Sequence, residues 1–359
     1  MSFKTRLEEH RLLAPFTTFA IGGPARWFFQ ANSEDDVVEA TAWAHHREIP
    51  LFVLGGGSNL LVADAGFNGL VLRVALHGTS VDPGLSTSHK IYRAAAGEDW
   101  DSLVQRTVDQ NCAGVECLAG IPGTVGGTPV QNVGAYGQEV SSVIDRVRAF
   151  DLEDRVFVEL TAAECAFAYR SSRFNSTDRG RFLVTRVDYR LQVDGPPSLR
   201  YPDLQRAIAE HLSPGAQPTL QQVVALVRNI RQSKGMLLVE GDPDCRSAGS
   251  FFKNPIVAKS RLTQIAAAAA KEPPHYPVGL APELAATVKI PAAWLIEQSG
   301  LPKGHALGDA AISSRHTLAL VNRGKATAAE ILALAAQITA AVHDKFGISL
   351  ELEPVLLGF

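Results

Sequence analysis

The chain has 359 residues, of which 46% are apolar, and a formal net charge of −3. This length predicts two or three domains with sizeable cores. The small negative charge gives no reason to expect nucleic acid or an anionic membrane as a partner. The N-terminus lacks an apolar signal core, and no apolar run is long enough to cross a bilayer. We therefore expect a cytoplasmic protein with unpaired thiols and no metal site; a monomer is compatible with the sequence.

The first glycine-rich loop follows a short predicted α/β segment. A strand is predicted over 26–30, and the spacing of Ser33 and Asp36 predicts the cap of a helix through 37–43. An apolar strand over 51–54 then ends in a loop made of Gly55, Gly56, Gly57, Ser58 and Asn59. Such a loop at the end of a strand can offer backbone N–H groups to a phosphate. Taken alone, it fits an ordinary tight turn equally well.

A second glycine-rich stretch, 118–137, follows a strand predicted over 89–95 and a helix beginning near Trp100. Glycine inside a regular element costs roughly 0.5–1 kcal/mol against alanine, so this density favours a loop with a partner against bare backbone. Its N–H groups are expected to form an anion-binding nest. The spacing is neither G-x-G-x-x-G nor a Walker motif. A set of turns between strands is the alternative.

The middle of the chain predicts a hairpin around residues 152–154 and a short helix over 161–170, capped by Thr161. A half-buried strand over 183–191 follows, because apolar and charged residues alternate there. Two further helices begin near Pro202 and Thr219. The periodicity is lost after Lys234, where we place a domain boundary.

The C-terminal region predicts helices over about 260–271 and 292–299, and a last helix between a Thr327 cap and a Gly347 stop. A closing strand is predicted over 348–357. The twofold periodicity of a strand would place Glu351 and Glu353 on one face.

Six stretches, taken together and in this order, resemble the UDP-N-acetylenolpyruvoylglucosamine reductase family. They are the segments 55–61, 120–127, 132–137, 169–172, 249–255 and 292–298. Each stretch alone is a weak signal, whereas the ordered set is specific and covers nearly the whole chain.

The resemblance implies an α+β fold: a two-subdomain FAD-binding module of the vanillyl-alcohol-oxidase type and a smaller α+β substrate-binding domain. The expected boundaries are 1–75 and 76–234 for the two FAD-binding subdomains, with the strand 348–359 returning to the second, and 235–347 for the substrate-binding domain. FAD is expected to be non-covalent, because residues 55–59 contain no histidine. The implied cofactor-binding residues are Gly55, Gly56, Gly57, Ser58, Asn59, Gly120, Gly123, Thr124, Gly126, Gly127, Asn132, Gly134, Ala135 and Tyr136.

The family activity implies that NADPH reduces the flavin and that the enolpyruvyl ether of UDP-N-acetylglucosamine then occupies the same cleft. Hydride goes to the distal vinyl carbon, and the adjacent carbon must be protonated. By match to the family, Ser250 is the proton donor, which Lys253 and Asn254 could assist. Arg170 would face the negative charge on the carboxyl side.

Glu353 matches the third catalytic position, although the local sequence departs from the usual family pattern and leaves Glu351 as an alternative. A carboxylate would repel an enolate, so we infer that it acts protonated or through a hydrogen bond. The implied substrate-binding residues are Tyr169, Tyr201, Lys234, Asn254 and Gln298. Two rivals stay open: an FAD-dependent oxidase or dehydrogenase of the same fold, acting on an alcohol or hydroxy acid, and a non-catalytic nucleotide-binding protein.

Overall fold

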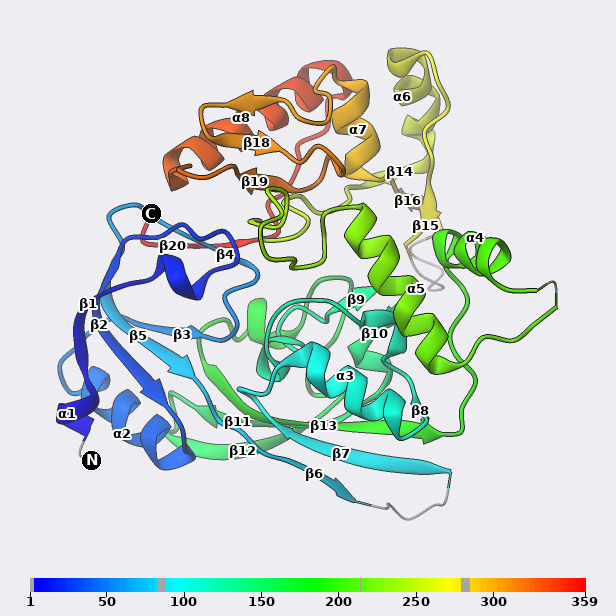
Figure 1. Cartoon of the computed structure of the whole chain (residues 1–359). Helices are drawn as coiled ribbons and strands as arrows, with labels where there is room; N and C mark the ends of the chain where they lie inside the picture. The colour runs from blue at the N-terminus through cyan, green and yellow to red at the C-terminus, as the bar shows by residue number, and fades with distance from the viewer. Residues whose placement is uncertain (1–2, 83–87, 214, 279–284) are drawn as a thin grey trace. The chain divides into compact units, whose positions relative to one another are not determined.

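The chain folds into two compact units built from interleaved segments. The computed structural model describes residues 3–82, 88–213, 215–278 and 285–359 (Figure 1). Unit 1 comprises Met1–Arg11, Ala25–Gly57 and Asn68–Ser233. Unit 2 comprises Leu12–Pro24, Ser58–Phe67 and Lys234–Phe359. The sequence suggested three mainly consecutive regions, and one of their boundaries lies beside the division between Ser233 and Lys234.

Unit 1 contains two larger sheets, which Figure 1 shows in blue and in cyan to green. The first has the strand order β1-β2-β5-β3. Its strands are β1 (Glu8–Leu12), β2 (Pro24–Ala31), β5 (Phe67–Val74) and β3 (Leu51–Leu54). The second sheet is antiparallel, with the order β12-β11-β13-β7-β6, and β8 also pairs with β13. Its strands are β12 (Val156–Thr161), β11 (Ile144–Asp151), β13 (Phe182–Val193), β7 (His89–Ala95), β6 (Thr79–Asp82) and β8 (Cys112–Ala113).

The described part of unit 1 contains five α-helices, two of which begin at caps predicted from the sequence. They are α1 (Phe3–Arg6), α2 (Glu34–His45), α3 (Trp100–Asp109), α4 (Pro202–His211) and α5 (Leu220–Ser233). The Ser33 hydroxyl accepts from Asp36 N at 3.1 Å, and Thr219 Oγ1 accepts from Gln222 N at 3.2 Å. The predicted helix caps are therefore confirmed at α2 and α5.

The core of unit 1 joins α3 to the antiparallel sheet. Trp100 on α3 and Tyr189 on β13 are both fully buried, with ring centroids 5.6 Å apart. The Trp100 indole N–H donates to Leu118 O at 3.1 Å, so its polar edge is satisfied inside the core. The start of α3 is thereby fixed against the residues that lead into the second glycine-rich loop.

The prediction of a helix over 161–170 is wrong. Over 162–170 the chain makes turns and an isolated bridge between Ala168 and Ser171. Thr161 and Glu164 form the predicted reciprocal hydrogen bonds, and Cys165 N donates to Thr161 O at 3.1 Å. Ala166 then adopts a φ of 48°, in the left-handed region, which ends the helical turn immediately.

The described residues of unit 2 form short sheets and three α-helices, and the part after Lys234 is drawn in green-yellow to red in Figure 1. One sheet has the order β14-β16-β15 and another β17-β18-β19. The strands are β14 (Ile256–Ala258), β15 (Tyr276–Pro277), β16 (Thr287–Lys289), β17 (Ala306–Leu307), β18 (Ala310–Ile312) and β19 (Leu320–Asn322). The helices are α6 (Leu262–Ala269), α7 (Ala292–Gln298) and α8 (Ala328–Phe346). Phe19, Ile21 and Leu61 join their core from the two early segments.

The closing strand is shorter than predicted and pairs elsewhere. Regular pairing is confined to β20 (Val355–Leu357), which runs parallel to β4 (Leu60–Val62). We expected the segment 348–359 to return to the region 76–234. Before β20, Leu352 forms only an isolated bridge, with Phe252. Pro354, which has no N–H to donate, separates this bridge from β20 and explains the break in the strand.

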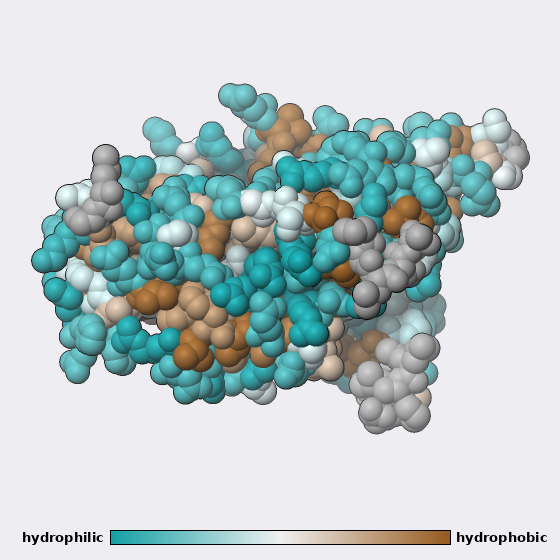
Figure 2. Space-filling view, turned by 90° about the horizontal axis from the view of Figure 1, so that it is seen from below, coloured by the Kyte–Doolittle hydropathy of each residue, from teal (hydrophilic) through white to brown (hydrophobic). Residues whose placement is uncertain are grey.

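The surface is mixed in character. The face in Figure 2 is mostly hydrophilic, with hydrophobic residues gathered in separate patches. Among the described residues, no helix has the length and apolarity needed to cross a membrane.

The N-terminus of α8 is satisfied by two side chains far apart in sequence. Asp64 Oδ1 accepts from Ala328 N at 2.8 Å, and Asp64 Oδ2 from Ala329 N at 3.1 Å. Thr327 Oγ1 accepts from Glu330 N, also at 3.1 Å, within a complete capping box. The first three amides of the helix are therefore paired.

We predict that Asp64→Ala lowers the free energy of unfolding by about 1–2 kcal/mol, because two first-turn amides lose a charged acceptor. Thermal and urea denaturation measure the change. Asp344→Ala, at an exposed position near the other end of α8, is the matched control and should be neutral. Equal stability of the two variants would show that Asp64 contributes nothing to the cap.

Candidate active site

The two glycine-rich loops meet backbone to backbone in unit 1. A Cβ added to Gly56 would lie 2.6 Å from Gly123 Cα, closer than a real Cβ contact allows. A Cβ on Gly55 would lie 3.0 Å from Thr124 Oγ1. Glycine is therefore required at Gly56, and the loops form a single surface although Gly56 and Gly123 are 67 positions apart in sequence.

The two loops use their backbone N–H groups differently. In the second loop, Val125 N donates to Glu98 O and Gly126 N to Ala96 O, both at 2.9 Å. Gly127 N and Thr128 N close a 3₁₀ turn. These amides are therefore unavailable to an anion, contrary to the nest expected from the sequence. Within the described part of the chain, the amides of residues 55–59 donate no hydrogen bond and keep that capacity.

The second loop contains unsatisfied polar atoms, and the one on Thr124 lies beside the first loop. Among the described residues, Thr124 Oγ1 and Gln131 Oε1 are two of five buried side-chain atoms without a hydrogen-bond partner. Native proteins rarely leave such atoms unpaired unless a ligand or water meets them. A Cβ on Gly127 would have open space around it. A dinucleotide with phosphates and amide-like edges, such as FAD, fits this combination of donors, acceptors and space.

The start of the second loop is clamped at Gly120. Gly120 N donates to Asp101 Oδ1 at 2.6 Å, and Gly120 O accepts from Arg231 Nε at 3.0 Å. Burial lowers the pKa of the Arg231 guanidinium, whereas the nearby Tyr136 and Asp101 oppose that effect. Both peptide groups of Gly120 are thus fixed by side chains of α3 and α5.

The end of the second loop is a hairpin that the sequence did not reveal. β9 (Gly134–Ala135) pairs with β10 (Gln138–Glu139). Tyr136 and Gly137 connect them with φ values of 49° and 83°, the signature of a two-residue I′ turn. The Tyr136 ring meets the Tyr201 ring edge-on, with centroids 5.4 Å apart. The glycine at 137 was the available signal for this turn.

Arg170 is held at the tip of a tight turn beside this hairpin. Ala168 and Ser171 exchange backbone hydrogen bonds, and Arg170 has a φ of 54°, which costs a non-glycine residue about 1–3 kcal/mol. Its Nη2 donates to Gly134 O at 2.8 Å, and its Cζ lies 5.5 Å from the centre of the Tyr169 ring. The structure thus brings together three residues that the sequence placed in the site.

Asn132 ties this turn to the hairpin through its own side chain. It is 1% exposed, and its Nδ2 donates to Ala168 O and to Glu139 Oε2 at 2.9 and 3.0 Å. Its Oδ1 accepts from Ser141 N at 3.2 Å. Asn132 thereby holds the Arg170 turn in place, and the cofactor contact suggested by the sequence stays a prediction.

Ser250 and Glu353 lie close together in the backbone of unit 2. Lys253 N donates to Glu351 O at 2.9 Å, and Glu353 N donates to Phe251 O at 3.0 Å. Ser250 precedes this ladder directly. Asn59 Nδ2 donates to Glu353 O at 3.2 Å, so a residue of the first loop also fixes the position of Glu353.

Glu351 and Glu353 have different surroundings. Glu351 has a side chain that is 72% exposed, and Lys253 Nζ lies 2.5 Å from its Oε1. Glu353 is half-buried. The Lys253 ammonium is paired with Glu351, and its assistance to Ser250 stays a prediction.

The remaining substrate-binding candidates of unit 2 lie at helix ends or in the loop after α5. Asn254 Oδ1 accepts from Ala292 N at 2.9 Å and so caps α7. Gln298 is the last residue of α7, and its carbonyl accepts from Lys345 Nζ at 2.5 Å. The half-buried Lys234 lies near His316, because its charge is one of the causes, after burial, that lower the pKa of His316 to about 4.

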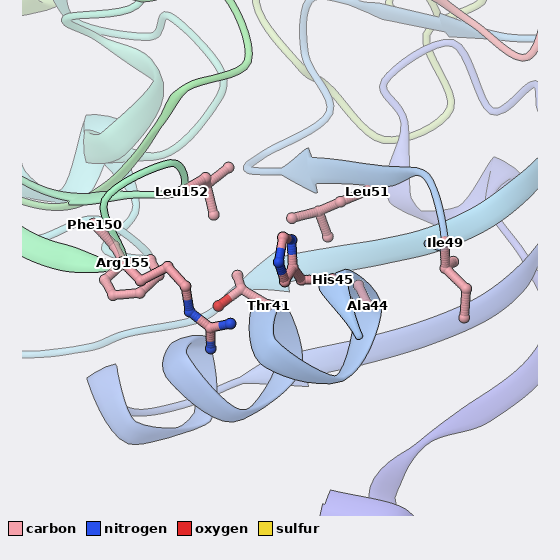
Figure 3. A pocket seen from close by; sticks show the side chains of 8 residues that line it. All are labelled: Thr41, Ala44, His45, Ile49, Leu51, Phe150, Leu152 and Arg155. Carbon is pink, nitrogen blue, oxygen red and sulfur yellow. The ribbon is translucent and has the colours of Figure 1, made fainter. Parts of the chain in front are cut away.

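A separate hollow of about 180 Å³ lies in unit 1 between the end of α2, β3 and the β11–β12 hairpin (Figure 3). Its floor is mainly apolar, and His45 and Arg155 point toward it from its rim. It is lined by none of the residues that the sequence placed in the site.

We predict that Gly127→Ala weakens FAD binding by roughly tenfold or more, since filling space that a ligand occupies costs about 1–3 kcal/mol, while the apoprotein keeps its stability. Gly126→Ala should instead destabilise the apoprotein, because the added Cβ would lie 2.6 Å from Ala96 Cβ. FAD titration and thermal melts of both apoproteins separate these effects. Unchanged FAD affinity in Gly127→Ala would place the cofactor elsewhere.

Comparisons with known proteins show the family of the chain. Residues 25–157 match the family model "FAD binding domain", and residues 242–357 match "UDP-N-acetylenolpyruvoylglucosamine reductase, C-terminal domain". The reductase of that name from Streptomyces coelicolor is 44% identical over 354 residues, covering 96% of this chain and 89% of the relative. The one from Thermobifida fusca is 46% identical over 356 residues, covering 96% of both chains.

The crystal structure of the Thermus caldophilus UDP-N-acetylenolpyruvylglucosamine reductase superposes with a TM-score of 0.65 and 27% identity, covering 98% of this chain and 99% of that one. The α+β FAD-binding fold and the FAD cofactor expected from the sequence are confirmed. The chain therefore belongs to the UDP-N-acetylenolpyruvoylglucosamine reductase family of FAD-dependent oxidoreductases.

Proposed function

We propose that the chain catalyses the NADPH-dependent reduction of the enolpyruvyl ether of UDP-N-acetylglucosamine to UDP-N-acetylmuramate, a cytoplasmic step in making peptidoglycan precursors. NADPH and the nucleotide substrate use one cleft in turn. The observation that carries this proposal is the hydrogen bond from Glu353 N to Phe251 O, which brings the backbone of Glu353 beside the residue that follows Ser250.

FAD would be held by residues 55–59, by Thr124 and Gln131, and by the open face at Gly127. When bound, it supplies the hydride that is taken from NADPH and delivered to the vinyl carbon distal to the ether oxygen. The chain's own residues must orient the substrate, stabilise the negative charge and supply one proton. No covalent tether to the flavin is proposed, because residues 55–59 contain no histidine.

Arg170 is the proposed partner of the substrate carboxylate. Its guanidinium can form two parallel hydrogen bonds to a carboxylate and remains charged at any physiological pH. The strained turn and the bond to Gly134 O restrict its position before substrate arrives. Such preorganisation favours stabilisation of the negative charge that develops next to the carboxylate.

Ser250 is the proposed proton donor to the adjacent carbon, and Glu353 acts in the same step. Gly249, with a φ of 72°, precedes Ser250 and lets the chain turn into the ladder. Between the two candidate carboxylates, Glu353 is favoured, because Glu351 is exposed and paired with Lys253. Tyr201 and Lys234 are the proposed contacts of the nucleotide diphosphate.

The rival is an FAD-dependent oxidase or dehydrogenase acting on an alcohol or hydroxy acid. The purified holoenzyme should be yellow, release its flavin on denaturation, and consume NADPH rapidly only when the enolpyruvyl nucleotide is present. The rival would be favoured if the protein consumed oxygen with an alcohol or hydroxy acid and did not consume NADPH with the nucleotide.

We predict that Ser250→Ala leaves flavin reduction by NADPH intact and slows flavin reoxidation by substrate by roughly 10²–10⁴-fold, the usual contribution of a general acid. Stopped-flow absorbance at the flavin band measures the two half-reactions separately. Ser260→Ala, at an exposed position in the same unit, is the control. Normal reoxidation in Ser250→Ala would mean that another group donates the proton.

We also predict that Glu353→Gln abolishes most turnover, whereas Glu351→Gln stays near wild type. The reason is that Glu351 is exposed and neutralised by Lys253, while Glu353 is half-buried beside the residues next to Ser250. Steady-state NADPH oxidation with the nucleotide substrate checks both variants. The reverse ranking would transfer the catalytic role to Glu351.

A further inference from the structure

Unit 1 contains a buried carboxylate that the proposed chemistry does not use. Glu116 lies in the 3₁₀ turn Glu116–Leu118, just before the second glycine-rich loop, and is 0% exposed. Burying an ionised group is costly unless hydrogen bonds satisfy it. Its surroundings must therefore supply donors, and the identity of those donors shows what the residue connects.

Three neutral donors from three segments converge on Glu116. Gly114 N donates to Oε2 at 2.8 Å, and Gln138 Nε2 and Ser198 N both donate to Oε1 at 2.8 Å. Gly114 is local, whereas Gln138 and Ser198 are 22 and 82 residues away. The carboxylate is thus the common point of contact of the β9–β10 hairpin and the segment before α4.

The two peptide groups of Ser198 form hydrogen bonds with two consecutive residues, Glu116 and Cys117. In addition to the bond to Glu116, its carbonyl accepts from Cys117 Sγ at 3.2 Å. Burial, and secondly the neighbouring Glu116 carboxylate, raise the pKa of the Cys117 thiol. The thiol therefore stays protonated and able to donate at physiological pH.

The hairpin is fixed to the same turn through Gln138. While its Nε2 donates to Glu116, its Oε1 accepts from Cys117 N at 2.8 Å. Gln138 pairs with Ala135 across the hairpin, and Tyr136 at the tip meets the ring of Tyr201. The turn at 116–118 thus fixes the position of both segments that carry a tyrosine: the β9–β10 hairpin with Tyr136 and the segment before α4 with Tyr201.

We propose that Glu116 is a positioning residue that holds the hairpin of Tyr136 and the segment of Tyr201 in register for binding the nucleotide substrate. Tyr201 is 39% exposed and is the N-cap residue of α4, three residues after Ser198, so displacement of Ser198 moves the tyrosine. This inference rests on the proposed function, in which Tyr201 contacts the diphosphate. It assigns Glu116 to substrate affinity and not to hydride or proton transfer.

The test compares the holoenzyme with three variants. Glu116→Ala removes all three acceptor bonds, and Cys117→Ala removes only the bond to Ser198 O. Asp151→Ala is the matched control, because Asp151 is a buried carboxylate of the same unit that accepts from Glu153 N, Asp154 N and Arg181. Each protein is assayed for FAD content, thermal stability, flavin reduction by NADPH, and kcat and KM for the enolpyruvyl nucleotide.

We expect Glu116→Ala to raise the KM for the nucleotide by roughly tenfold, the size of a lost buried hydrogen bond to a charged group, with unchanged flavin reduction. Cys117→Ala should give a smaller rise in KM. This variant also tests the inference if Glu116→Ala does not fold. Amide hydrogen exchange at Ser198 should be faster in both. Asp151→Ala should lose stability without a change in KM.

A KM that is unchanged in Cys117→Ala and Glu116→Ala, or that rises equally in Asp151→Ala, would overturn the inference. Failure of the proposed function is a different result, because the wild-type holoenzyme would then not oxidise NADPH with the nucleotide at all. In that case hydrogen exchange at Ser198 still reports on the structural link, and its constancy in Glu116→Ala would refute the link itself.

Discussion

The contact between the bare backbones of Gly56 and Gly123 is the constraint on which unit 1 depends. A side chain at Gly56 would separate two loops whose polar atoms, Thr124 Oγ1 above all, face a common surface. The surrounding structure acts to keep that contact. Residues 96–100 pair with the second loop, and Asp101 and Arg231 hold both peptide groups of Gly120. A cofactor surface made of backbone in this way is rigid because its supports are core elements.

Strain and buried polarity gather around the same loops. Asn132, Tyr136 and Arg170 all have positive φ values, although none is glycine. Each is held by specific contacts: Asn132 by its three hydrogen bonds, Arg170 by Gly134 O, and Tyr136 by its place in the I′ turn. Such conformations persist only where neighbours over-determine them, and they are typical of sites that must be preorganised.

Local sequence signals predicted local structure well. Ser33, Thr219 and Thr327 cap the helices that they were expected to cap, and Gly347 ends α8 with a φ of 60°. Two of the failures show why the rest could not be predicted. Over 161–170 the Thr161 cap was predicted correctly. The helix nevertheless stops at Ala166, whose left-handed conformation is not indicated by its helix propensity. Glu116 was not identified at all, because its significance comes from donors that lie 22 and 82 residues away.

The interleaving of the two units also limits how the protein can be dissected. β20 near the C-terminus pairs with β4, and the N-terminus of α8 is capped by the carboxylate of Asp64. Both β4 and Asp64 belong to the ten-residue segment Ser58–Phe67, which lies in sequence between two segments of unit 1. A fragment that starts at Lys234 would lack both, and a fragment that ends at Ser233 would carry them without their partners. Neither half of the gene, cut at that point, encodes a self-sufficient folding domain, so the two halves must be made as one polypeptide or allowed to complement each other.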